Sequence, residues 1–194
     1  RAAGSALGRE LVERVGQRLV ELLQGSHLSS VERARAGDTL ARLGDPRFRA
    51  DAWFLPNESL LGFVDIPAGP SVMGSNKKQD PQAAEEETPQ HTLPLPGYYI
   101  SRYPVTVAQF RAFIKESGHD PQDRDCLRAL DTYPVVNITW HEALKYCQWL
   151  TTQLRAWQKT PEPLATLLRK EGWEVTLPSE AEWEKAGRGE KRSH

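Results

Sequence analysis

Cysteine and methionine are scarce in this chain of 194 residues, which has two cysteines and one methionine. Two cysteines, Cys126 and Cys147, are too few for the disulfide framework of a small secreted domain. Cys147 falls within an amphipathic helical pattern, where a buried structural thiol is the expected role. A disulfide between the two cysteines is the alternative. Because reduced thiols are typical of the cytoplasm, we predict a cytoplasmic protein.

Long hydrophobic runs and an excess of one charge are also missing. No apolar run approaches the ~18 residues that a membrane-spanning helix needs. Glu10, Glu13 and Arg14 interrupt the first apolar residues, so this stretch does not have the pattern of a signal peptide. The formal net charge is -1, which provides no general attraction to nucleic acid. We therefore predict neither a membrane nor a nucleic-acid partner.

The sequence has little that points to a catalytic or metal site. It contains no glycine-rich phosphate loop, no Ser-His-Asp set and no zinc-ligand spacing. A soft metal needs two or more sulfurs placed together, and Cys126 stands in a polar loop while Cys147 lies on an apolar helix face. Glu180, Glu182 and Glu184 occupy alternate positions of a helix, and successive members of this set do not share a face. We predict no catalytic, cofactor-binding or metal-binding residue in this chain.

The first part of the chain has the pattern of two amphipathic helices. Leucine and valine recur at three- and four-residue steps over 7–23, and a second pattern covers 30–43. Ser29 and Glu32 have the spacing of a capping box at the start of the second helix. We predict a helical hairpin over 1–46, which resembles a terminal repeat of the HEAT type. Such a hairpin cannot bury its apolar face alone, so it packs on the next domain or ends a longer helical array.

After a connector over 47–60, the chain alternates short strands and helices, which predicts an α+β domain over 61–194. Two short strands joined by a proline-glycine turn are predicted over 61–75, and an extended stretch over 93–100. A strand end is predicted over 175–177, because its apolar residues alternate.

Three further capping boxes predict helix starts in this part of the chain. They pair Thr106 with Gln109, Thr139 with Glu142, and Ser179 with Glu182. The first helix should end at Gly118, and a short helix is predicted over 164–170. The helix after Thr139 should bury one face, composed of Trp140, Ala143, Leu144, Cys147, Leu150 and Leu154.

The stretch over 76–90 is polar and acidic, and two interpretations of it are open. A solvated surface loop is the simpler one. A site for a cation or a basic ligand is the alternative, because Asp80, Glu85, Glu86 and Glu87 lie close together in sequence. His91, at the end of this stretch, has no second His or Cys at ligand spacing and is predicted to be structural.

Four segments of the last two thirds of the chain carry a family resemblance. They read I-P-A-G-P-S-V-M-G (66–74), Y-P-V-T (103–106), P-V-V-N-I-T-W (134–140) and L-P-S-E-A-E-W-E-K-A-G-R-G (177–189). Together they resemble the formylglycine-generating enzyme family, also called sulfatase-modifying factors. The resemblance implies a variant of the C-type lectin-like fold, of which this chain matches the front half. Thr176, Ser179 and Gly187 depart from the usual family residues.

The resemblance implies two functions of different classes. The enzyme branch of the family oxidises a cysteine of a substrate sulfatase to formylglycine, using oxygen and a copper ion held by two cysteines. Those cysteines, and the residues that hold calcium, lie in the family's C-terminal half and have no match here. Other lectin-like members bind ligands or proteins within bacterial signalling, defence or diversity-generating systems.

We predict that this chain acts as such a recognition module for a protein or small-molecule ligand. A complementary C-terminal segment of the same domain is its expected partner, because early strands pair with late ones in lectin-like folds. Calcium or copper would require that segment. The alternative function is part of a formylglycine-generating oxidase whose catalytic half lies outside this sequence.

Overall fold

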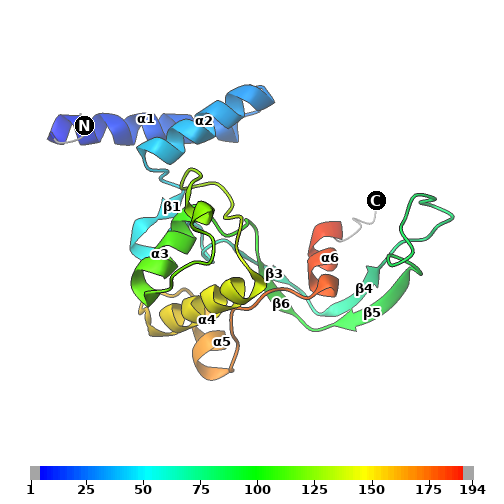
Figure 1. Ribbon diagram of the computed structural model, residues 1–194. Helices are drawn as coiled ribbons and strands as arrows, with labels where there is room; N and C mark the ends of the chain where they lie inside the picture. The colour runs from blue at the N-terminus through cyan, green and yellow to red at the C-terminus, as the bar shows by residue number, and fades with distance from the viewer. Residues whose placement is uncertain (1–4, 190–194) are drawn as a thin grey trace. The chain divides into compact units, whose positions relative to one another are not determined.

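The computed structural model describes residues 5–189, which belong to two compact units (Figure 1). Unit 1 comprises the chain up to Gly62 together with Tyr103–Val175. Unit 2 comprises Phe63–Arg102 and the chain from Thr176 onward. Among the described residues, no helix has the length and apolarity needed to span a bilayer.

Unit 1 begins with helices α1 (Ala6–Gln24) and α2 (Ser30–Leu43), close to the predicted ranges. The two helices pack against each other around Leu40, which is fully buried, and Val20. A Cβ at Gly16 would meet Pro46 at 3.8 Å and Leu40 at 4.0 Å, which is ordinary van der Waals contact, so the close packing of this side of α1 does not require glycine. Leucine and valine side chains on the other flank of α1 remain exposed, so the pair buries only part of its apolar surface.

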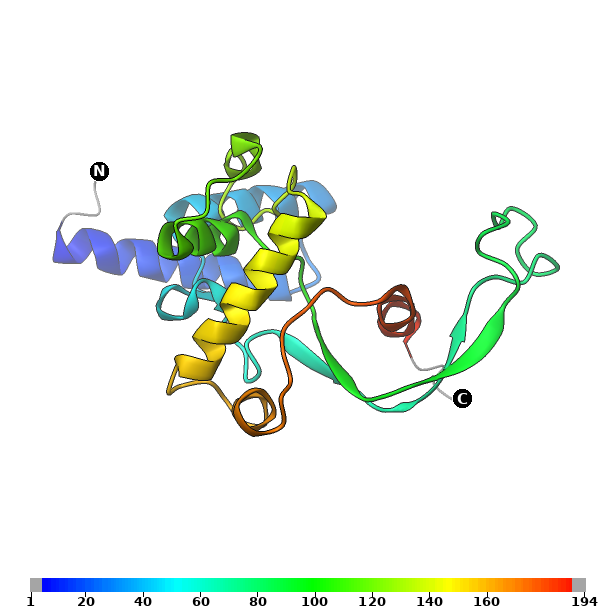
Figure 2. The same cartoon turned by 60° about the horizontal axis from the view of Figure 1, so that its bottom comes forward.

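The remainder of unit 1 is mostly helical (Figure 2). Its helices are α3 (Val107–Ser117), α4 (Trp140–Ala156) and α5 (Leu164–Lys170), and its 3-10 turns are η2 (Ala50–Ala52) and η3 (Arg124–Leu127). The predicted connector is ordered, because β1 (Phe48–Arg49) and β2 (Leu55–Pro56) pair there in antiparallel fashion. Phe110 of α3 and Leu154 of α4 are almost completely buried and mark the core. The short helix predicted over 164–170 is confirmed as α5.

The four predicted capping boxes are all present. They lie at the starts of α2, α3, α4 and α6 (Glu180–Arg188). In each box, the side-chain hydroxyl of the cap residue accepts from the backbone N–H of the third helical residue. The side chain of that third residue in turn accepts from the backbone N–H of the cap residue. Gly118 ends α3 with a φ of 71°, a left-handed conformation that glycine adopts without strain. Local sequence chemistry therefore determines where these helices begin, and in α3 also where it ends.

Unit 2 contains two antiparallel strand pairs and one helix. Strand β3 (Phe63–Ile66) pairs with β6 (Tyr98–Ser101), with Phe63 opposite Ser101. Strand β4 (Gly69–Met73) pairs with β5 (His91–Leu95), with Gly69 opposite Leu95. The two strands predicted around the proline-glycine turn exist as β3 and β4. They do not pair with each other, because each finds its partner in the extended stretch that follows the 76–90 loop.

Helix α6 packs against β4 through polar contacts. The Lys185 Nζ atom donates to the Pro67 carbonyl at 2.6 Å, and the Tyr98 hydroxyl donates to the Glu182 carbonyl at 2.6 Å. Glu184 accepts from the Gly74 backbone N–H at 3.1 Å. No residue of α6 is buried, and Trp183 is 66% exposed. The helix is thus positioned by its polar side, while its largest apolar side chain faces solvent.

Two expectations from the sequence are wrong in detail. Residues 175–177 form no strand, because the Val175 backbone N–H donates to the Thr151 hydroxyl at 2.9 Å instead of joining a strand ladder. Trp140 lies on the predicted apolar side of α4 but is 62% exposed, because it occupies the first turn, beyond the buried part of that face.

Candidate functional site

Both thiols of the chain are buried and free. Cys126, which the sequence placed in a polar loop, lies in η3 and is 1% exposed. Cys147 lies in α4 and is 6% exposed, which agrees with the predicted structural role. Burial raises the pKa of the Cys126 thiol and raises that of Cys147 to about 11. Since the thiolate is the form that binds metals, neither residue fits a copper ligand.

The described residues also contain no group of three or more His, Cys, Asp or Glu side chains able to hold a metal ion. The carboxylates of α6 have structural contacts instead. Glu182 accepts from the Ser179 backbone N–H at 2.7 Å as part of the capping box. Glu184 accepts from Gly74 and from Arg188, whose Nε donates at 2.8 Å. Their spacing therefore reflects helix capping and attachment of α6 to the strand.

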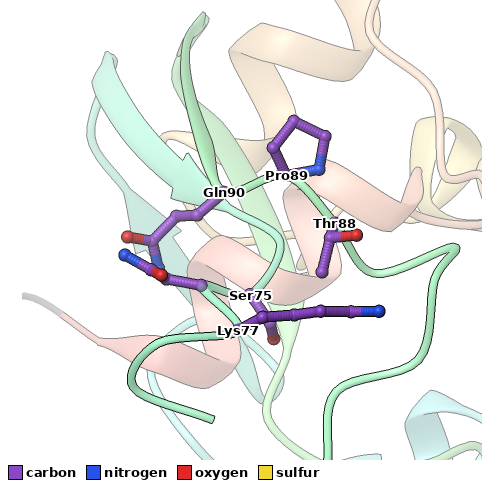
Figure 3. A pocket seen from close by; sticks show the side chains of 6 residues that line it. Ser75, Lys77, Thr88, Pro89 and Gln90 are labelled. Atoms are coloured by element: carbon purple, nitrogen blue, oxygen red, sulfur yellow. The ribbon is translucent and has the colours of Figure 1, made fainter. Parts of the chain in front are cut away.

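Unit 2 has a shallow cavity of about 330 Å³ where β4 leads into the 76–90 loop (Figure 3). Lys77, Thr88 and Gln90 are among the residues that line it. The loop is closed by the Ser75 backbone N–H, which donates to the Glu87 carbonyl at 2.6 Å. A Cβ at Gly74 would lie 2.7 Å from that same carbonyl, so the turn requires glycine. The cavity therefore belongs to a loop whose path is fixed by its backbone.

The acidic side chains of this loop are used locally. Glu85 accepts from the Lys77 Nζ atom at 2.9 Å, and Asp80 accepts from the Gln82 backbone N–H at 3.2 Å. His91 contacts the Pro89 carbonyl through Nδ1 at 3.0 Å, which fits its predicted structural role. These contacts favour the loop interpretation over a cation site.

Unit 1 has a second cavity, of about 410 Å³ and more open to solvent than the first, between the C-terminal end of α3 and one face of α4. Phe113 and Trp149 form its apolar wall, with ring centroids 5.6 Å apart. The His119 ring stacks on Phe113 at a centroid distance of 5.1 Å and an interplanar angle of 28°. Lys145 and Gln148 line it from exposed positions of α4. The volume lies within the range of roughly 300–1,000 Å³ that is typical of small-molecule sites.

Glu142 fixes the polar side of this cavity. Its side chain is buried and accepts from the Gln122 backbone N–H at 2.9 Å and from the Thr139 backbone N–H at 2.8 Å. Burial alone raises the pKa of Glu142, but these hydrogen bonds, with those from the Thr139 hydroxyl and His119, lower it to about 2. The carboxylate therefore stays ionised and accepts from the His119 Nε2 atom at 3.2 Å. Because an ionised carboxylate can only accept, this contact places a proton on Nε2 of His119.

The sequence did not reveal this cavity. No local sequence pattern indicated a function for Trp149 or for the stretch that begins at His119. Glu142 was identified only as a helix cap. The available signal was the position of His119, directly after the helix-ending Gly118, because that glycine turns the chain back toward α4.

The fold is a mixed arrangement of helices and short antiparallel strands, as predicted. The chain belongs to the family defined by the sulfatase-modifying factor enzyme 1-like domain, which matches residues 53–194. The match confirms the resemblance to formylglycine-generating enzymes and includes part of the predicted connector.

Curated relatives carry several different names. The chain is similar to a hercynine oxygenase of Mycolicibacterium smegmatis, with 28% identity over 61% of this chain and 36% of the relative. It is 30% identical to a formylglycine-generating enzyme of Thermomonospora curvata, over 69% of this chain and 51% of the relative. It is 26% identical to the serine/threonine-protein kinase Pkn1 of Chlamydia trachomatis, over 70% of this chain and 21% of the relative. The chain thus spans about half or less of the length of these relatives.

Proposed function

We propose that this chain is the front part of a lectin-like sulfatase-modifying-factor domain that recognises a protein or small-molecule ligand. The domain would serve a multidomain bacterial protein of signalling, defence or diversity-generating type, working in the cytoplasm. The observation that carries the proposal is the aromatic-walled cavity of unit 1, which has the size of a ligand site. The only two thiols of the chain are buried elsewhere in the packing and have raised pKa values.

Two further observations support a recognition role. One relative is named as a protein kinase and matches this chain over only 21% of its own length, so a related domain occurs within a much larger signalling protein. The α1–α2 pair, which lies before the family match, also keeps exposed apolar side chains on one flank, including Leu7 and Leu11. Such a surface is suited to contacts with other parts of a larger assembly.

A complementary C-terminal segment is part of the proposal. Strands β3 and β4 each have a single hydrogen-bonded neighbour among the described residues, so each keeps an open edge. Trp183 in unit 2 and Trp140 in unit 1 are both more than half exposed, which is unusual for side chains of this size. A further segment of the same domain would pair with the open edges and cover these rings. Calcium or copper would bind only with residues from that segment.

The alternative is a part of a formylglycine-generating oxidase, which is favoured by the relative of that name in Thermomonospora curvata. The two functions can be separated with the full-length product of the gene. The protein is incubated with copper, oxygen, a thiol reductant and a cysteine peptide from a sulfatase, and the peptide is analysed by mass spectrometry.

We expect no formylglycine from the full-length protein, while the enzyme of Thermomonospora curvata, treated in parallel, converts the peptide. Conversion at a comparable rate would refute the recognition role and establish the oxidase.

A further inference from the structure

The cavity of unit 1 combines an apolar wall with a polar rim whose charged residue, Lys145, is positive. This combination indicates which ligands the cavity binds. The wall is rigid, because Phe113 is 2% and Trp149 is 9% exposed and both rings are held by aromatic neighbours. Tyr146 lies 5.9 Å from Phe113 and 5.7 Å from Trp149, measured between ring centroids. A planar apolar group can therefore bind against the edges of these rings that reach the surface, without reorganising the wall.

The rim supplies hydrogen-bond donors and one full positive charge. Lys145 is exposed and forms no salt bridge or hydrogen bond within the described part of the chain. Gln148, one helical turn further along α4, contributes an amide on the same side as Lys145. Glu142, which holds His119 at this rim, is only 5% exposed and already accepts four hydrogen bonds.

An unpaired donor lies in the wall itself. The Trp149 indole N–H is buried and has no hydrogen-bond partner among residues 5–189. Buried donors are normally paired, and leaving one unpaired costs about 1–3 kcal/mol. The resonance of this N–H therefore reports on a ligand bound against the Trp149 ring.

We propose that this cavity binds a planar aromatic group that carries a carboxylate, with the ring against Phe113 and Trp149 and the carboxylate at Lys145. The inference rests on the proposed recognition role and names its ligand class. The carboxylate belongs either to a free aromatic acid or to the C-terminal aromatic residue of a polypeptide, since both present the same chemistry.

The test uses ¹⁵N-labelled full-length protein, titrated with phenylacetate and, separately, with uncharged phenylacetamide. We expect phenylacetate to produce saturable shifts at the Trp149 indole N–H and at the His119 and Gln148 backbone resonances. Phenylacetamide should bind more weakly, because it cannot pair with the lysine charge. Equal binding of the two compounds, or shifts that avoid these resonances, would overturn the proposal.

Lys145→Gln removes the charge, and Lys170→Gln, at an exposed position of α5, is the matched control. We expect Lys145→Gln to raise the Kd for phenylacetate about three- to fivefold, as for a partly exposed ion pair, and to leave phenylacetamide unaffected. Lys170→Gln should change neither affinity. Unchanged phenylacetate binding in Lys145→Gln would contradict the assigned role of the lysine.

A further variant tests the cavity without disturbing its wall. Thr152 lines the cavity from an exposed position, so Thr152→Trp should fold normally and block entry to it. We expect this variant to lose phenylacetate binding. Retained binding would place the ligand elsewhere and refute the site.

Short peptides that end in phenylalanine distinguish the two sources of the carboxylate. Each peptide is tested with a free C-terminal carboxylate and with an amidated C-terminus. Tighter binding of the acid peptide than of phenylacetate identifies a chain terminus as the ligand. Binding of phenylacetate without binding of the peptide identifies a free acid. These titrations are independent of the sulfatase-peptide assay. Failure of phenylacetate to bind would refute the proposed ligand class, whereas formation of formylglycine would refute the recognition role.

Discussion

At the residue scale, Glu142 shows how one side chain can serve two purposes. It completes the capping box that begins α4, and it also binds the loop that follows α3 through Gln122 and His119. The capping role was visible in the sequence, because it depends on a spacing of three residues. The loop contacts join positions twenty or more residues apart, and no local pattern encodes them. The sequence therefore identified the residue and only half of its function.

The pH dependence of stability follows from this carboxylate. Its pKa is lowered from 4.5 to about 2 in the folded protein. A lowered folded-state pKa contributes stability above pH 4.5, and this contribution is lost as the pH falls toward 2. We predict that Glu142→Gln lowers the free energy of unfolding by about 1–3 kcal/mol at pH 7, the typical cost of disrupting hydrogen bonds to a buried charge.

Urea unfolding of the wild type and of Glu142→Gln at pH 7 and pH 3 checks this prediction. The difference between the two proteins should be smaller at pH 3 than at pH 7. Glu182→Gln, in the more exposed capping box of α6, is the control and should cost less. A difference for Glu142→Gln that does not depend on pH would show that its ionised form is not what stabilises the fold.

At the element scale, helix starts were predictable and strand partners were not. Each capping box is defined by two side chains three residues apart, so Ser29, Thr106, Thr139 and Ser179 were all correctly identified. Strand pairing depends on residues that are distant in the sequence. The alternation of apolar residues at 175–177 therefore gave no information about which strand, if any, would pair with this segment. The predicted burial of Trp140 was wrong for a related reason. Helical periodicity defines which residues share a face, but it does not define how much of that face is covered by the rest of the protein.

The segment around Val175 is held by a side chain in place of a strand neighbour. The Thr151 hydroxyl accepts from the Val175 backbone N–H at 2.9 Å, and it donates to the Cys147 carbonyl at 2.9 Å. We predict that Thr151→Val, which conserves volume but removes the hydroxyl, lowers the free energy of unfolding by about 1–3 kcal/mol, because it leaves a partly buried donor unpaired.

Thr152→Val is the matched control, because the Thr152 hydroxyl is exposed and bonds only within its own helix. Chemical unfolding should show no more than a small change for this control. Hydrogen exchange should also become faster at the Val175 amide in Thr151→Val and not in Thr152→Val. Equal exchange in both variants would mean that the hydroxyl does not hold the segment.

At the scale of the whole molecule, the family match and the exposed rings lead to the same expectation. The match extends over 53–194, yet the chain covers 51% of the Thermomonospora curvata relative and less of the others described above. We predict that Trp183 and Trp140, now 66% and 62% exposed, become protected when the proposed complementary segment is present. Hydroxyl-radical footprinting of the 194-residue chain and of the full-length gene product measures this protection.

Trp173, 36% exposed, serves as an internal reference in the same experiment. Protection confined to Trp183 and Trp140 would support the complementary segment. Equal oxidation of both residues in the two proteins would show that nothing covers them, and the proposed completion of the domain would be wrong.

The division of the chain into units has a consequence for its synthesis. Unit 1 has all of its residues once Val175 has been made, although Phe63–Arg102, which belongs to unit 2, interrupts it. Unit 2 still lacks α6 at that moment, because Glu180–Arg188 are among the last described residues. Domains generally fold as units during translation, N-terminal parts first. On the ribosome, unit 1 is therefore able to fold before the helix that anchors β4 has been made, although both strand pairs of unit 2 are already synthesised.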